Sequence, residues 1–130
     1  MPDPVEHLQT VGEIVQGLRQ LGLEPVLVGG MALVVLGSRR VTRDFDFVIA
    51  HPGDRLARTI GLFYDHGLHL ASRLNDMGEV ISTITNRRVA TIRLRVDAPA
   101  SAYSFNAAAG LRVDLLFDFP LAAAELAKHA

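Results

Sequence analysis

The chain has 130 residues, of which 49% are hydrophobic and 21% charged, and its formal net charge is −1. This length and composition indicate one folded domain with a buried core and exclude a disordered chain, and the balanced charge excludes a global basic field that would recruit nucleic acid. The chain contains no cysteine, which excludes disulfides, thiolate metal sites and thiol catalysis.

The first predicted element is an amphipathic helix over residues 4–21, where apolar side chains recur at helical spacing. Residues 25–28 form a short apolar run between a proline and a glycine pair, which predicts a buried strand. Gly29-Gly30 is then expected to turn the chain into a short buried helix over residues 31–36, because that segment is apolar on all sides.

The middle of the chain begins with a basic loop over residues 39–43. Residues 44–49 are predicted to form a strand, and Asp54 is expected to cap a helix that runs to about Asp65. We expect residues 67–79 to be irregular and residues 80–85 to form a strand.

The last third of the chain contains two alternating segments. Residues 89–97 are predicted to form a half-buried strand and residues 112–119 a second strand, separated by a loop over 98–110. Residues 121–130 are expected to be helical. Since no repeat or linker interrupts the pattern, we expect a single α/β (α+β) domain over residues 1–130.

Carboxylates lie on one face of two predicted strands. Asp44 and Asp46 alternate with apolar residues in the first strand, and Asp114 does so in the second. If the strands are neighbours, the three carboxylates converge, and they would repel one another unless cations lay between them. Oxygen ligands of this kind suit Mg²⁺ or Mn²⁺, which support phosphoryl transfer. The alternative is that these aspartates only form the solvent-exposed face of a strand and bind no ligand.

The glycine pair adds a second signal. Gly29 and Gly30 lie between a predicted strand and a predicted helix, where backbone N–H groups can approach a phosphate closely. The alternative is a tight turn without a ligand.

Together these segments resemble the nucleotidyltransferase-fold superfamily. The resemblance rests on Val-Leu-Val-Gly-Gly-Met-Ala-Leu at 26–33, Arg-Val-Thr-Arg-Asp-Phe-Asp-Phe at 40–47 and Arg-Val-Asp-Leu-Leu-Phe at 112–117. The minimal, AbiEii-like nucleotidyltransferases of toxin–antitoxin systems look most alike, and the CCA-adding enzymes and poly(A) polymerases are similar at a greater distance. The resemblance implies a mixed, twisted sheet with helices packed mainly on one side.

The resemblance also implies roles for single residues. Gly29 and Gly30 would hold the triphosphate, and Asp44 and Asp46 would be paired metal ligands. Asp114 would be the third carboxylate, which shares a metal ion and acts as the general base. The remaining candidates for phosphate binding are Arg40, Thr42 and Arg43. For the arginines, charge balance against nearby aspartates is an equal alternative.

The implied activity is transfer of an NMP from an NTP, such as ATP, to an acceptor hydroxyl with release of pyrophosphate. The acceptor could be RNA or protein, and an antitoxin could be a partner. The alternative is a non-catalytic module of the same fold that binds nucleotide or protein. Relatives usually continue into a C-terminal helical region, which this chain could lack.

Two further observations bear on partners and location. A basic patch that could face an RNA acceptor consists of Arg87, Arg88, Arg93 and Arg95. We favour the alternative that these side chains form the solvent-exposed side of an edge strand. The N-terminus has no apolar region typical of a signal peptide, and the longest apolar run is too short to span a bilayer. We therefore expect a cytoplasmic protein without a membrane partner.

Overall fold

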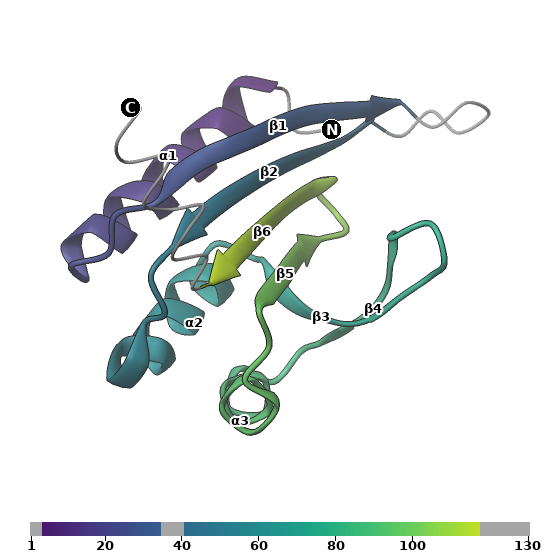
Figure 1. The fold of residues 1–130 in the computed structure, drawn as a ribbon. Coiled ribbons are helices and arrows are strands. Elements are labelled where there is room, and N and C mark those ends of the chain that lie inside the picture. Colours follow the sequence, from purple (N-terminus) through teal and green to yellow (C-terminus); the bar gives the residue numbers. More distant parts are fainter. Residues whose placement is uncertain (1–3, 35–40, 118–130) are drawn as a thin grey trace.

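The computed structural model describes residues 4–34 and 41–117, in which helices and strands form a mixed α/β fold (Figure 1). The described elements are three α-helices, one short 3-10 helix and six strands. In chain order they are α1 (Pro4–Gln20), β1 (Val26–Val34), β2 (Val41–Ile49), η1 (Gly53–Arg55), α2 (Leu56–Asp65), β3 (His69–Leu74), β4 (Val80–Ile84), α3 (Arg87–Asp97), β5 (Ser101–Asn106) and β6 (Leu111–Phe117).

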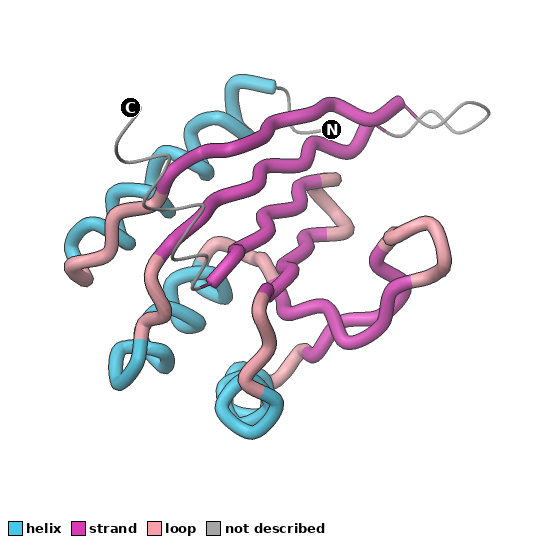
Figure 2. The backbone as a smooth tube through the Cα atoms, in the orientation of Figure 1, coloured by secondary structure: helices cyan, strands magenta, loops and turns pink. Residues whose placement is uncertain are grey.

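The six strands form one open sheet in the order β1-β2-β6-β5-β3-β4 (Figure 2). The β2–β6 pair is parallel, and the other four pairs are antiparallel. Strands from the first and last parts of the described chain therefore become neighbours in the centre of the sheet. This central pair is the part of the fold that positions the candidate site.

The hydrophobic core lies between one face of the sheet and the helices. Helices α1 and α2 lie behind the sheet in the view of Figure 1. Their buried residues form one cluster with the apolar side chains of β2 and β6, which include Phe45, Phe47, Val113 and Leu115. Because side chains alternate along a strand, the residues between these positions project from the opposite face. That opposite face carries the carboxylates.

Several predicted elements are confirmed. The helix predicted over 4–21 is α1, the strand predicted over 44–49 lies within β2, and the strand predicted over 80–85 is β4. The strand predicted over 112–119 corresponds to β6 as far as Phe117, where the described residues end. The helix predicted to reach Asp65 is α2, but Asp54 does not cap it: the N-cap is Arg55, without a side-chain capping bond.

The strand predicted over residues 25–28 is confirmed as the start of β1, but the turn at Gly29-Gly30 and the helix over 31–36 are wrong where the structure describes them. Strand β1 continues through Gly29 and Gly30 to Val34, so there is neither a strand-to-helix turn nor a helix over 31–34. Its first residues are not buried either, since Leu27 is 55% exposed at this edge of the sheet. Antiparallel pairing with β2 accounts for the strand, because a short apolar run fits a paired strand as well as a buried helix. Residues 35 and 36 lie outside the described residues.

The prediction of a strand over 89–97 is also wrong, because this segment is helix α3. The side chain of Asn86 accepts a hydrogen bond from the backbone N–H of Val89, which caps the helix. The buried side chains are Ala90, Thr91 and Leu94, which lie on one helical face. Since two of these three are small or polar, the helical period was hidden behind an apparent alternation of apolar and basic residues.

Two segments expected to be irregular contain strands: β3 lies within 67–79 and β5 within 98–110. The helix predicted over 121–130 falls outside the described residues. Among the described helices, none is both long and apolar enough to cross a membrane.

Candidate carboxylate site

Three aspartates lie on one face of the sheet where β2 and β6 run side by side. In the parallel register Asp46 pairs with Asp114, and Asp44 pairs with Arg112. Paired positions on neighbouring strands project from the same face of a sheet, and so do positions two residues apart on one strand. Asp44, Asp46 and Asp114 therefore share the face opposite the apolar core, which the predicted convergence requires.

The row through Asp46 and Asp114 extends onto the outer strands. Gly29 of β1 pairs with Asp46, and Tyr103 of β5 pairs with Asp114. A Cβ atom added at Gly29 would lie 3.1 Å from Oδ2 of Asp46, which is tighter than most real contacts. The lack of a side chain at Gly29 thus leaves room for the Asp46 carboxylate over β1.

Arg112 is the cation of this site and is held by three different groups. Its Nε donates hydrogen bonds to Oδ1 and Oδ2 of Asp114 at 2.9 and 3.2 Å. One terminal nitrogen donates to the carbonyl oxygen of Gly78 at 2.6 Å, and the guanidinium lies 5.0 Å from the centre of the Tyr103 ring. The pair is largely withdrawn from solvent, since the side chains of Arg112 and Asp114 are 14% and 10% exposed.

Burial raises the pKa of two of the three aspartates. Desolvation raises the pKa of Asp114 to about 6, although Arg112 opposes this shift and the charges of Asp46 and Asp44 add to it. Desolvation also raises the pKa of Asp44, with Arg112 lowering it and Asp46 raising it. One guanidinium therefore does not compensate three neighbouring carboxylates, and additional positive charge would stabilise their ionised forms.

The donor chemistry of the site fits a hard divalent cation. Oδ1 of Asp44 is buried and has no hydrogen-bond partner among the described residues, which leaves an acceptor oxygen for a ligand. Carboxylate oxygens are the ligands that Mg²⁺ and Mn²⁺ prefer. Within residues 4–34 and 41–117, no three His, Asp or Glu side chains already lie in an arrangement that would hold a metal ion. The guanidinium of Arg112 occupies both oxygens of Asp114 instead.

The structure divides the other predicted site residues into two groups. Gly29 lies beside Asp46, although in a strand rather than in the turn that was predicted, and Gly30 is the next residue of that strand. A register shift between Leu27 and Gly29 marks a bulge next to this position. Glycines and bulges inside strands are common where a ligand approaches the backbone.

Among the other candidates, Arg43 does not share the face of the carboxylates. Alternation along β2 places Arg43 on the face of Phe45, opposite Asp44. Thr42 belongs to β2 and pairs with Leu33. Arg40 lies outside the described residues.

Sequence reasoning missed two functional candidates at this site. The alternation of β6 placed Arg112 on the same face as Asp114 but assigned it no role, although an arginine two residues from a carboxylate on a strand is a signal for an ion pair. Tyr103 was missed because its segment was expected to be a loop. The contact with Gly78 depends on the β3–β4 turn, and no sequence pattern pointed to it.

Comparison of the chain with models of known protein families, with characterised proteins and with solved structures found no match.

Proposed function

We propose that the protein is a metal-dependent nucleotidyltransferase that moves an NMP from an NTP to an acceptor hydroxyl with release of pyrophosphate. The observation that carries this proposal is the parallel pairing of β2 with β6, which aligns Asp46 with Asp114 and leaves Asp44 two residues away on the same face. The fold would be the nucleotidyltransferase fold that the sequence resembles.

Asp44, Asp46 and Asp114 would hold the metal. Mg²⁺ or Mn²⁺ bound there would neutralise the charge of the triphosphate and favour attack at its α-phosphorus. Arg112 would have to leave at least one oxygen of Asp114 for this to happen, and its position beside the site would let its guanidinium turn to a phosphate oxygen.

Asp114 would also accept the proton of the acceptor hydroxyl. The acceptor oxygen forms a bond to the α-phosphorus, the bond to the oxygen bridging to the β-phosphate breaks, and pyrophosphate leaves. Without a metal ion, burial raises the pKa of Asp114 to about 6. A bound cation would lower this pKa, so that Asp114 would be ionised near neutral pH and able to accept a proton. Gly29 would let the triphosphate approach β1 closely, because nothing projects from its Cα atom.

A second candidate is a non-catalytic module that binds nucleotide or a protein partner on the same face. The observation that favours it is the ion pair between Arg112 and Asp114, which competes with a metal ion for a carboxylate that catalysis requires. A toxin regulated by an antitoxin is compatible with the first candidate, since it would still be an enzyme.

Transfer assays with labelled NTPs, Mg²⁺ or Mn²⁺, and RNA or protein acceptors test the proposal. The variant Asp46→Asn keeps the size of the side chain but removes its charge, and we expect it to lower kcat by at least about 10³-fold. The matched control is Asp54→Asn, an exposed aspartate of η1, which should act like the wild type. Full activity in Asp46→Asn would contradict the assignment. Nucleotide binding without pyrophosphate release in the wild type would favour the non-catalytic module.

A further inference from the structure

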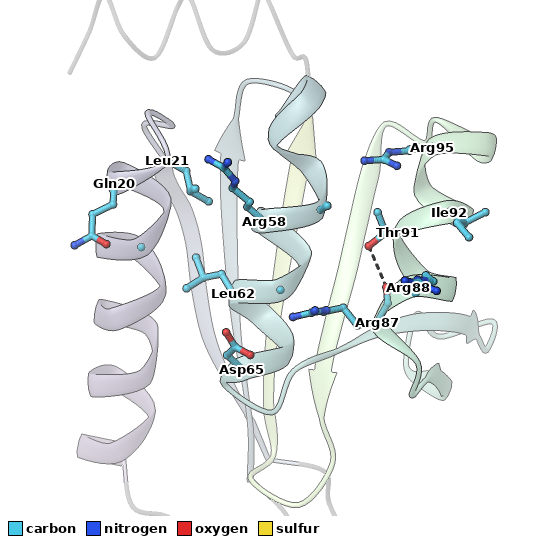
Figure 3. A pocket seen from close by; sticks show the side chains of 13 residues that line it. Gln20, Leu21, Arg58, Leu62, Asp65, Arg87, Arg88, Thr91, Ile92 and Arg95 are labelled. Carbon is cyan, nitrogen blue, oxygen red and sulfur yellow. Dashed lines mark hydrogen bonds between the residues drawn. The ribbon is translucent and has the colours of Figure 1, made fainter.

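A second polar surface lies on the helical side of the molecule, away from the carboxylates. A groove of about 690 Å³ runs between α1, α2 and α3 (Figure 3). Its polar side chains include four arginines and a single carboxylate: Arg58, Arg87, Arg88, Arg95 and Asp65. The groove is therefore strongly basic in a chain whose net charge is −1.

The charges of the four groove arginines are not neutralised by neighbouring carboxylates, unlike those of three other arginines of the described chain. Arg19, Arg93 and Arg112 form ion pairs with Glu24, Asp97 and Asp114, and all six residues lie outside the groove. No groove arginine makes an ion pair or a side-chain hydrogen bond with a described residue. Uncompensated guanidinium groups gathered in one concavity indicate an anionic ligand.

The position of two of them on α3 strengthens this inference. Arg87 and Arg88 are the first residues of the helix, and no acidic residue lies in its first turn. The N-terminus of a helix carries a partial positive charge, so cations there destabilise the helix and anions are attracted to it. Stability of α3 therefore does not explain these arginines, whereas binding of an anion does.

Two glycines shape the groove. A Cβ atom at Gly17 of α1 would lie 2.6 Å from Cδ1 of Leu62, so this glycine permits α1 and α2 to pack closely. A Cβ atom at Gly61 of α2 would lie 3.3 Å from a terminal nitrogen of Arg87. Figure 3 shows Arg87 and Arg95 extending from α3 toward α2. The absence of a side chain at Gly61 leaves space for the guanidinium against that helix.

The length of the basic surface indicates the class of ligand. Arg87 and Arg95 are eight residues apart on α3, which corresponds to about 12 Å along the helix axis. A single phosphate cannot span this distance, whereas a nucleic-acid strand offers phosphates at spacings of a few ångströms. None of the described residues that line the groove is aromatic, so bases would not stack on them and contact would be to the backbone.

We propose that the groove binds the phosphodiester backbone of RNA, independently of base sequence. That this RNA is also the acceptor rests on the proposed function. A bound strand would then pass from the groove around the edge of the sheet to reach the carboxylates on the other face.

The test is fluorescence anisotropy of a labelled 20-nucleotide single-stranded RNA of mixed sequence, titrated with protein at several salt concentrations. The double variant Arg87→Gln/Arg95→Gln should lower affinity by about tenfold or more. Its log–log salt slope should be shallower than that of the wild type by about 1.4, because two phosphate contacts are lost. The matched control Arg73→Gln/Arg93→Gln removes the same charge outside the groove and should change affinity by less than about twofold.

Thermal melting of each variant verifies folding, and Arg87→Lys/Arg95→Lys should keep most of the affinity because the charge remains. Absence of RNA binding by the wild type, or equal losses in groove and control variants, would overturn the proposal. So would displacement of RNA by a poly-glutamate peptide at equal charge concentration, since that would favour an acidic protein.

The binding assay is repeated with the Asp46→Asn variant in EDTA. RNA binding that persists there would show that the groove binds RNA independently of the carboxylate site. If the wild type with Mg²⁺ also shows no transfer, the groove is supported and the proposed function is rejected. If the wild type transfers to RNA and the groove variants change neither KM nor RNA affinity, the proposed function is supported and the groove is rejected as the RNA-binding surface.

Discussion

The two faces of the molecule arrange charge in opposite ways. On the carboxylate face, three aspartates and Arg112 lie on adjacent central strands, and the Arg112–Asp114 pair is almost withdrawn from water. In the groove, four arginines extend from helices, are exposed and have no described partner. A rigid, desolvated cluster alters pKa values and positions ligands, which catalysis requires. An exposed, unpaired cluster attracts a polyanion without fixing its geometry.

The largest effect on stability should come from breaking the buried ion pair. Replacing Arg112 with Gln leaves Asp114 desolvated without its counter-ion, and we expect the free energy of unfolding in urea to fall by about 3–5 kcal/mol. Mg²⁺ should then stabilise this variant more than the wild type.

The control for this comparison is Arg93→Gln, which breaks the exposed pair with Asp97 on α3. Because both side chains are more than half exposed, its cost should be about 0.5 kcal/mol or less. Equal losses in the two variants would mean that the carboxylate face is no more desolvated than the groove side.

The second largest effect should be a pH dependence of stability that arises from Asp114 on the carboxylate face. The pKa of Asp114 is raised to about 6 in the folded state, against an ordinary value of 3.8, so the folded state binds this proton more tightly. The resulting stability is fully present below about pH 3.8 and is lost as the pH rises through about 6. The total loss should be roughly 3 kcal/mol.

Urea unfolding of the wild type and of Asp114→Asn between pH 4 and pH 7 measures this contribution, because the variant cannot titrate there. The stability of the wild type relative to the variant should decline across this range without metal. A difference that is flat or that rises with pH would show that Asp114 titrates normally.

The smallest effect concerns the glycine beside Asp46. In Gly29→Ala the new Cβ would press on the Asp46 carboxylate at 3.1 Å. We expect Mg²⁺ affinity to fall by about tenfold, the scale seen when groups that orient metal ligands are changed.

The control is Gly12→Ala on α1, where nothing lies within 4 Å of the added atom. It should stabilise the helix by up to about 1 kcal/mol and leave Mg²⁺ affinity unchanged. Calorimetric titration of Mg²⁺ compares the two variants, and unchanged affinity in Gly29→Ala would remove Gly29 from the site.

The strands that carry the carboxylates could be predicted because their residues alternate between large apolar and acidic side chains, as in Asp44-Phe45-Asp46-Phe47. That these two strands are neighbours in the sheet had to be assumed, because pairing between segments almost 70 residues apart leaves no local signal in the sequence. The hydrogen bond from Arg112 to the carbonyl oxygen of Gly78 could not be predicted for the same reason.

The errors have a different origin. Residues 31–34 are apolar on all sides and suit either a helix or a strand, and long-range pairing with β2 decides between them. In α3, Ile92 and Val96 are exposed while Thr91 is buried, so the hydrophobic pattern indicates the wrong face and the wrong period. The sequence did single out Arg87, Arg88 and Arg95 as part of a basic patch, but assigned them to a strand. Arg58 joins them only through the packing of α2 against α3, which leaves no local signal.

The central claim is that the carboxylate face binds a divalent cation together with a nucleoside triphosphate. Calorimetric titration of a non-hydrolysable NTP analogue, with and without Mg²⁺, into the wild type and into Asp44→Asn/Asp46→Asn tests it most directly. We predict binding that requires Mg²⁺ and disappears in the folded double variant. Equal binding by the variant, or none by a folded wild type, would contradict the claim.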